Sequence, residues 1–138
     1  MSFIKTVTEC GYVAIDLYDG SFIYDFLRDT LTICDIDLFL KAPHTNTMGR
    51  MWGNSRFMAP EEYEFGAKID EVTNVFTIGA LSFAFFGDAN DKIFEKWTAG
   101  MSLYNVVKCA MNPERNKRFH SIEEFIYNWN FAKDILNL

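Results

Sequence analysis

Three aspartates in the first third of the chain could do chemistry together. Asp16 follows a short apolar run, Asp35 ends a candidate strand, and Asp37 lies two residues further on. Carboxylates at the ends of a hairpin can converge on one spot, and a carboxylate pair beside a mobile loop suits Mg²⁺ and phosphate chemistry. Aspartate also favours turns and strand ends for local reasons. Spacing alone therefore leaves open both a metal site and ordinary turn residues.

A small β-hairpin is the element expected to position these aspartates. Apolar and β-branched residues predict strands over 22–26 and 31–34, with 27–30 as the turn between them. The next stretch, 35–52, has no periodicity, and residues 41–49 within it are typical of a loop. A loop of that length inside a compact domain is usually functional or mobile.

The rest of the chain predicts helices, so the expected fold class is mainly α with a small β component (α+β). Residues 72–86 are apolar all round, which is typical of a central buried helix. Ser121 and Glu124 form a capping-box pattern that predicts the start of the last helix. Further helices are expected at four places: 2–10, from Pro60, 92–97 and 103–111.

Length and composition narrow the class of protein. The chain has 138 residues, one domain by length, with 49% hydrophobic and 23% charged residues. Its net charge of −6 argues against a nucleic-acid partner, because the phosphate backbone repels an acidic protein. The longest apolar stretch, 75–86, is too short to span a bilayer, and the first residues carry no secretory signal. We therefore expect a soluble cytoplasmic protein without membrane or nucleic-acid partners.

Five segments, taken in order, resemble the C-terminal lobe of a divergent eukaryotic-type serine/threonine protein kinase. The catalytic-loop motif of that family, H-R-D-L-K-x-x-N, corresponds to residues 14–21, and its D-F-G motif corresponds to Asp35-Ile36-Asp37. The activation-segment motif G-T-P-x-Y-M-A-P-E corresponds to 53–61. The helix motif D-x-W-S-L-G corresponds to 74–79, and D-P-x-x-R resembles 112–118. The order of the segments carries the resemblance, because each motif alone is weak.

The resemblance implies roles for three polar residues around the catalytic loop. Asp16 would accept or orient the hydroxyl proton of the substrate, and Asp35 would hold Mg²⁺ against the β- and γ-phosphates of ATP. Ser21 falls on the asparagine that holds a second metal ion in the family. A serine hydroxyl can also bond its own backbone in a turn, which is the alternative for Ser21. Mg²⁺ and ATP are the cofactors that the resemblance implies.

Two structural contacts are implied as well. Glu61 and Arg118 fall on residues that form a buried ion pair in the family, which anchors the activation segment to the helical core. Asn74 falls on the aspartate that braces the catalytic loop, and its amide could still accept hydrogen bonds from backbone N–H groups.

Several positions depart from the family pattern. Ala14 and Ile15 replace the histidine and arginine that precede the catalytic aspartate. Tyr18 replaces the lysine that contacts the transferred phosphate, so one positive charge is lost at the transition state. Asp37 replaces the glycine of the metal-binding motif.

The features that hold ATP in a kinase cannot be placed in this sequence. It has no G-x-G-x-x-G loop and no room before residue 11 for an N-terminal lobe with its phosphate-binding lysine. We therefore expect residues 1–138 to be a kinase C-lobe-like domain, a partial kinase domain without the N-lobe. By itself such a domain should neither bind Mg²⁺ and ATP nor transfer phosphate.

Three functions remain open. The first is the catalytic and substrate-binding lobe of a phosphotransferase that moves the ATP γ-phosphate to a Ser or Thr hydroxyl of a protein substrate, once an N-lobe is supplied. The second is a degenerate, pseudokinase-like interaction module, favoured by the departures at 14, 15, 18, 21, 37 and 74. The third is a small-molecule phosphotransferase, disfavoured by the segment 53–61.

The expected partner is the missing N-lobe or a second copy, docked on uncovered apolar surface.

Overall fold

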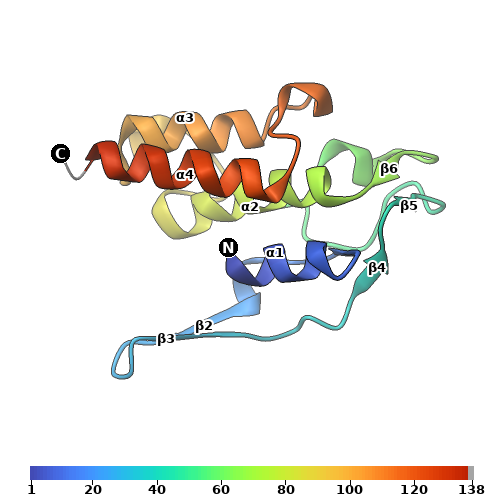
Figure 1. Cartoon of the computed structure of the whole chain (residues 1–138), viewed down its shortest axis with the longest axis horizontal. Helices are drawn as coiled ribbons and strands as arrows, with labels where there is room; N and C mark the ends of the chain where they lie inside the picture. The colour runs from blue at the N-terminus through green and yellow to red at the C-terminus, as the bar shows by residue number, and fades with distance from the viewer. Residues whose placement is uncertain (137–138) are drawn as a thin grey trace.

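The computed structural model describes residues 1–136 as a helical body with short paired strands (Figure 1). The α-helices of this described part are α1 (Ser2–Glu9), α2 (Glu71–Phe86), α3 (Gly100–Ala110) and α4 (Ile122–Leu136). Its strands form three antiparallel pairs: β1 (Tyr12–Ala14) with β4 (Phe39–Lys41), β2 (Phe22–Asp25) with β3 (Thr30–Ile33), and β5 (His44–Thr45) with β6 (Lys68–Ile69).

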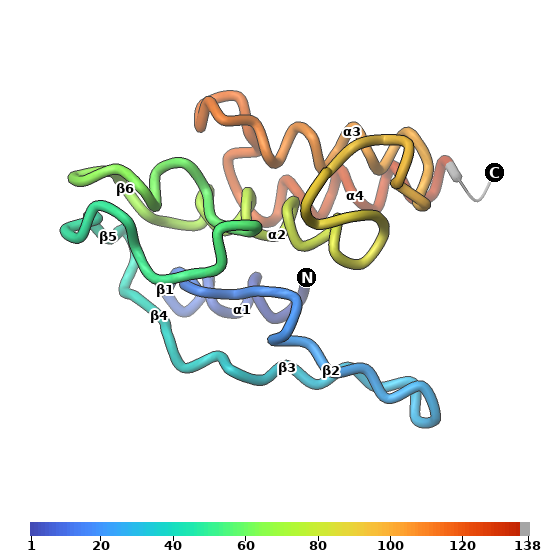
Figure 2. The backbone as a smooth tube through the Cα atoms, turned by 180° about the vertical axis from the view of Figure 1, so that it is seen from behind, coloured from blue at the N-terminus to red at the C-terminus, as the bar shows by residue number. Residues whose placement is uncertain are grey.

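The helices pack around α2, which lies between α3, α4 and the loop that follows β1. In both ribbon views α1 lies between this helical body and the arm that carries β2 and β3 (Figures 1 and 2). The main hydrophobic core gathers side chains from all four helices, with Phe83 and Phe125 fully buried. A smaller cluster under the strands is built from Val13, Ile15, Met51, Met58 and Ile69.

Helix α2 begins and packs as its sequence predicts. The Asp70 carboxylate accepts the Val72 N–H at 2.9 Å and caps the helix N-terminus. This N–H group in the first turn has no acceptor within the helix, so the cap supplies one. Most of its residues between Thr73 and Phe83 are buried, which agrees with a helix that is apolar all round. At Gly79 the helix touches α3 so closely that an added Cβ would lie 3.0 Å from the Ala110 side chain and 3.3 Å from the Val107 carbonyl.

Other elements agree with the sequence to within three residues, the largest difference being at the start of α3. The hairpin forms as β2 and β3, and the first helix ends before Gly11, whose φ of +79° suits a glycine. The capping box of the last helix also forms, since the Ser121 hydroxyl accepts the Glu124 N–H at 3.0 Å. None of the helices in residues 1–136 has the length and apolarity that a bilayer crossing needs.

Two sequence predictions were wrong in detail. The stretch 35–52 is not all loop, because β4 and β5 lie within it. Their partners, β1 and β6, are distant in sequence, so two or three residues suffice for pairing and no local periodicity marks them. The helix expected over 92–97 is only the 3₁₀ turn Phe94–Lys96, since Lys92 adopts the left-handed backbone conformation with a φ of +51°.

The close approach at Gly79 predicts an unusual response to alanine. At an exposed position inside a helix, replacing glycine by alanine stabilises the protein by about 1 kcal/mol. Here we expect Gly79→Ala to lower the free energy of unfolding by about 1–3 kcal/mol, because the methyl group overpacks the α2–α3 contact. Urea unfolding measures the difference, and a stabilised variant would contradict the close packing.

Candidate functional site

The loop 14–21 is fixed to α2 by one buried amide. The Asn74 side chain accepts the Ala14 N–H at 2.9 Å and donates to the Ala14 carbonyl at 2.7 Å. Asn74 is 1% exposed, so both bonds are shielded from water. An ionised aspartate could only accept, whereas an asparagine makes both bonds. The asparagine found at this position therefore suits the backbone that it holds.

The two aspartates of greatest interest approach a single tyrosine. The Tyr18 hydroxyl donates to Asp35 Oδ2 at 2.7 Å. This hydrogen bond and the negative charge of Asp35 raise the pKa of Tyr18 above its usual value, and desolvation and the charge of Asp16 add to the shift. Asp16 and Asp35 both adopt a left-handed backbone, with φ of +57° and +54°. Aspartate tolerates this conformation better than most residues.

Ser21 points away from this surface. It is 0% exposed, and its hydroxyl accepts the Tyr18 N–H at 3.4 Å. Its carbonyl accepts the Cys34 N–H at 2.8 Å and so ties the loop to the hairpin. Asp37, by contrast, is exposed. The polar atoms of Ser21 are thus used within the chain, as expected of a turn hydroxyl.

The donor set does not fit the magnesium site that the family implies. Asp35 is exposed, but one of its oxygens accepts the Tyr18 hydroxyl. Ser21 is buried and bonded to backbone. Among residues 1–136 no group of three or more His, Cys, Asp or Glu residues is arranged to hold a metal ion. A hard cation that needs about six oxygens would find one carboxylate and solvent here.

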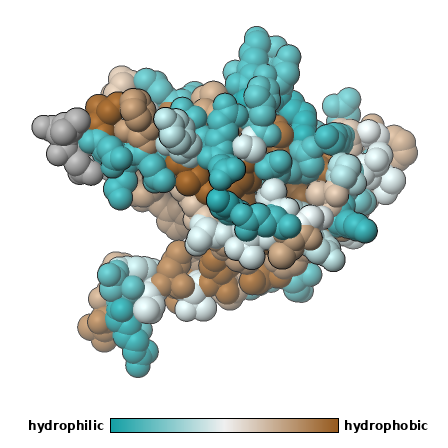
Figure 3. Space-filling view, viewed as in Figure 1, coloured by the Kyte–Doolittle hydropathy of each residue, from teal (hydrophilic) through white to brown (hydrophobic). Residues whose placement is uncertain are grey.

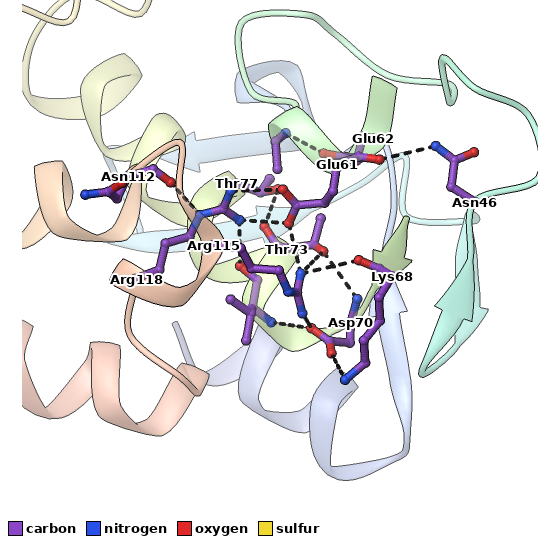
Figure 4. A network of polar contacts seen from close by, with 12 residues as sticks. Asn46, Glu61, Glu62, Lys68, Asp70, Thr73, Thr77, Asn112, Arg115 and Arg118 are labelled. Atoms are coloured by element: carbon purple, nitrogen blue, oxygen red, sulfur yellow. Dashed lines mark hydrogen bonds and ion pairs between the residues drawn. The ribbon is translucent and has the colours of Figure 1, made fainter. Parts of the chain in front are cut away.

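A buried ion pair anchors the segment that precedes α2. Arg118 donates to both oxygens of Glu61, at 2.7 and 2.9 Å, and its side chain is 0% exposed (Figure 4). Burial alone would raise the pKa of Glu61, but the hydrogen bonds and the charge of Arg118 hold it below the usual value. The bidentate geometry makes this the strong form of the contact.

Sequence reasoning missed the neighbours of this pair. Arg115 donates to Glu61 Oε1 at 3.0 Å and also pairs with Asp70, the N-cap of α2. Asn46 is fully buried and donates to the carbonyls of Gly49 and Glu61, which fixes the turn before the segment. Nothing in the local pattern marks these residues, because their partners lie far away in the chain.

Glu62, the residue after Glu61, is a further buried carboxyl group in this segment. It is 3% exposed, and one oxygen accepts the Ala59 N–H at 2.6 Å. Burial is the main reason that the pKa of Glu62 rises to about 7, and the charges of Glu61 and Asp16 raise it further, while Arg118 opposes them. One signal in the sequence could have indicated this contact. A glutamate at the third position of a helical turn often accepts the backbone N–H of the N-cap residue.

Glu62 also lines a small cavity beneath Asp16. The other side chains around this cavity are Leu17, Asn54, Phe57, Met58 and Thr77. The cavity thus brings the loop 14–21, the segment 53–62 and α2 together at one point. A proton on Glu62 would remove a negative charge from the underside of the Asp16 loop.

Known proteins provide a comparison at the level of fold. No family model matches the chain, and no curated protein sequence matches it. Among solved structures, the Cydia pomonella granulovirus kinase PK-1 is similar over 92% of this chain, with a TM-score of 0.69 and 15% sequence identity. This similarity shows a kinase-like fold. The match covers 53% of the viral kinase, so this chain spans about half its length.

The kinase-like fold confirms the predicted fold class. A mainly helical body with a small hairpin beside the loop 14–21 is the architecture that the sequence indicated. The segments that resembled kinase motifs also lie together: Asn74 holds the loop of Asp16, and Arg118 holds Glu61.

Removal of the buried arginine provides a test of the anchor. We expect Arg118→Ala to cost about 3–5 kcal/mol of unfolding free energy, because it leaves the Glu61 carboxylate buried without its partner. Lys117→Ala is the matched control, since Lys117 pairs with Glu114 on the surface and should cost less than about 1 kcal/mol. Equal melting temperatures for the two variants would contradict the anchoring role.

The raised pKa of Glu62 predicts a pH-dependent stability. The folded state binds this proton more tightly than the unfolded state, so its contribution to stability falls as pH rises from 4.5 to about 7. The Glu62→Gln variant has no ionisable group at this position, so it lacks this pH-dependent contribution to stability. Its side-chain amide oxygen can still accept the Ala59 N–H. We expect the variant to gain about 1–3 kcal/mol relative to the unmodified chain between about pH 5 and about pH 8.

Urea unfolding at several pH values measures this gap. Because the other titrating groups are shared, their effects cancel in the difference between the two proteins. A gap that stays constant with pH would show that Glu62 ionises as an ordinary surface carboxyl.

Proposed function

We propose that this chain is the C-terminal catalytic and substrate-binding lobe of a protein-kinase-like phosphotransferase. The observation that carries the proposal is the joint placement of the Asp16 loop, held by Asn74, and the 53–61 segment, held by Arg118. These are the two parts that must be rigid if a substrate hydroxyl is to be aligned for transfer. The kinase-like fold of the whole chain supports the same conclusion.

Within this proposal Asp16 orients the hydroxyl group of a Ser or Thr in a protein substrate. Its carboxylate is partly exposed at the loop surface. The segment 53–61 would dock the surrounding peptide. The γ-phosphate would come from ATP, but the phosphate-covering loop and the lysine of an ATP lobe are not in this sequence. Since the donor set around Asp35 also does not fit Mg²⁺, we propose that the chain alone binds neither Mg²⁺ nor ATP.

The proposed partner is an N-terminal lobe, with self-association as the alternative. The hairpin of β2 and β3 carries large apolar side chains into solvent, and Phe26 and Leu27 are 87% and 98% exposed. Ile23 and Leu31 on the two strands are more than half exposed as well. Figure 3 shows hydrophobic surface along the arm that leads to this hairpin. Apolar surface of this kind marks an interaction site.

A pseudokinase-like interaction module is the second candidate. The hydrogen bond from Tyr18 to Asp35 and the inward position of Ser21 favour it, because both remove oxygens from a metal site. A small-molecule phosphotransferase has less support, since the 53–61 segment is ordered and firmly anchored. A cytoplasmic location without membrane or nucleic-acid partners stays a prediction of the sequence.

Phosphate transfer tests the proposal. We expect no transfer from Mg²⁺–ATP to a Ser- and Thr-rich protein such as casein by the purified 138-residue chain. When a kinase N-terminal lobe is supplied upstream in the same polypeptide, we expect transfer that Asp16→Asn abolishes. Asp91→Asn, in an exposed pair with Lys96 outside the hairpin, is the control substitution and should leave transfer unchanged.

The outcomes separate the candidates. Transfer by the chain alone, or transfer that survives Asp16→Asn, would refute the proposal. Absence of transfer from the two-lobe protein, with ATP bound or not, would favour the interaction module.

A further inference from the structure

Helix α4 has two apolar faces, of which the core uses only one. The inner face carries Phe125, Trp129 and Ala132, which are buried in the main hydrophobic core. A surface helix of a globular protein normally has one such face and places polar residues opposite it. On α4 the opposite face also carries large apolar side chains, and these remain exposed although the helix packs against α1, α2 and α3.

The outer face of α4 is formed by Tyr127, Phe131 and Ile135, here called the α4 stripe. These residues are four positions apart, so they lie on one side of the helix. They are 69%, 60% and 47% exposed. In Figure 1 α4 lies in front of α3, and in the view from behind in Figure 2 it lies behind α3, so α3 leaves the outer side of α4 open. Contiguous apolar surface of this kind marks an interaction site.

A carboxylate lies at each end of the α4 stripe. Glu124 comes three positions before Tyr127, and Asp134 comes three positions after Phe131, so both lie on the same side of the helix as the stripe. Both residues are exposed. Lys133, the basic residue of α4, is two positions from Phe131, which places it about 200° around the helix and away from the stripe.

Cations from neighbouring elements do not compensate these two charges. Lys5 of α1 reaches α4, but its ammonium group donates to Glu123 at 3.2 Å. Among residues 1–136 no Lys or Arg forms an ion pair with Glu124 or Asp134. The α4 stripe is therefore an apolar surface with uncompensated negative charge at both ends.

Charge and size argue against a second copy as the occupant. If two α4 stripes packed together, Glu124 would face either Glu124 or Asp134 of the other copy, and like charges that face each other in an interface are unfavourable. The stripe spans eight residues, about 12 Å of helix. A stable interface buries about 800 Å² on each partner, which three side chains do not supply. Anionic lipid and nucleic-acid surfaces would be repelled as well.

We propose that the α4 stripe is the docking site for a short amphipathic helix of a partner protein, with an apolar face bounded by Lys or Arg at each end. The apolar side chains of this helix would be buried against Phe131 and its two neighbours, and its cations would pair with Glu124 and Asp134. The inference goes beyond the proposed function, because it uses no residue of the Asp16 loop or of the segment 53–61.

Two model peptides provide the probe. Each is a fluorescein-labelled amphipathic helix of about 15 residues, since shorter helices are marginal in water. One has a leucine face bounded by lysines, and the other has glutamates in place of the lysines. Fluorescence anisotropy with the whole chain measures binding. We expect the lysine peptide to bind about tenfold or more tightly than the glutamate peptide, and the difference to shrink as salt is added.

Substitutions on α4 locate the binding surface. We expect Phe131→Ala to weaken binding of the lysine peptide about tenfold, because the central aromatic contact is lost. Phe26→Ala is the matched control, since Phe26 is an equally exposed phenylalanine on the hairpin, and it should leave the affinity unchanged. Glu124→Gln combined with Asp134→Asn should weaken the lysine peptide about three- to tenfold and reduce the preference over the glutamate peptide.

Tyr127→Ala is a second variant within the stripe, and thermal melts identify any variant that does not fold. Equal affinity of the unmodified chain for the two peptides would overturn the inference. Unchanged binding by folded Phe131→Ala and Tyr127→Ala would overturn it too, because the peptide would then bind elsewhere. Sedimentation equilibrium tests the other occupant: a dimer that Phe131→Ala dissociates would show that a second copy covers the stripe, against the proposal.

Discussion

The buried contact between Arg118 and Glu61 is the constraint on which the rest of the structure depends. The Arg118 guanidinium donates to both Glu61 oxygens and to the Asn112 carbonyl, and it lies 5.0 Å from the centre of the Phe76 ring. A guanidinium has five N–H donors in a fixed plane. When it is buried, acceptors from the protein must lie at the ends of those N–H bonds, and this requirement fixes the positions of the segments that supply them. Three chain segments far apart in sequence are thereby held at one point.

Helix α2 transmits this order to the candidate site. Its N-cap residue, Asp70, pairs with Arg115, and Asn74 in its first turn makes two hydrogen bonds with the backbone of Ala14. Because the helix is buried on most of its surface, it cannot shift without disturbing the core. The loop of Asp16 and the segment of Glu61 are therefore parts of one rigid frame, and an ion pair at 3.0 Å between Asp19 of the loop and Arg56 of the segment also joins them directly. Rigidity of this kind is what alignment of a substrate requires.

The outer side of the loop is held less firmly than its inner side. There Tyr18 and Asp35 face solvent and hold each other by a single hydrogen bond. An exposed contact of this type contributes little to stability, so it can break without unfolding the frame beneath it. Glu62 lies on the inner side of the same loop and bears a pKa near neutrality through burial. The Asp16 loop thus lies between a rigid, proton-binding underside and an adjustable outer surface.

Much of the fold could be predicted from the sequence, because helices and hairpins depend on the pattern of residues that are close along the chain. The apolar run of α2, the capping residues at Ser121 and the turn of the hairpin each depend on neighbours a few residues away. Asp16, Asp35, Asn74, Glu61 and Arg118 were singled out differently, through the order of segments that resemble kinase motifs. The pairings of β4 and β5, by contrast, join residues 23 or more positions apart and leave no periodic signal.

The sequence by itself determined which residues are present for chemistry and that the chain is mainly helical. Only the tertiary structure decided how those residues are used. It turned Ser21 inward, placed the Tyr18 hydroxyl on Asp35, and buried Glu62 under Asp16. The physical reason is that hydrogen bonds and charges act through space over a few ångströms, whereas sequence patterns report only what lies close along the chain.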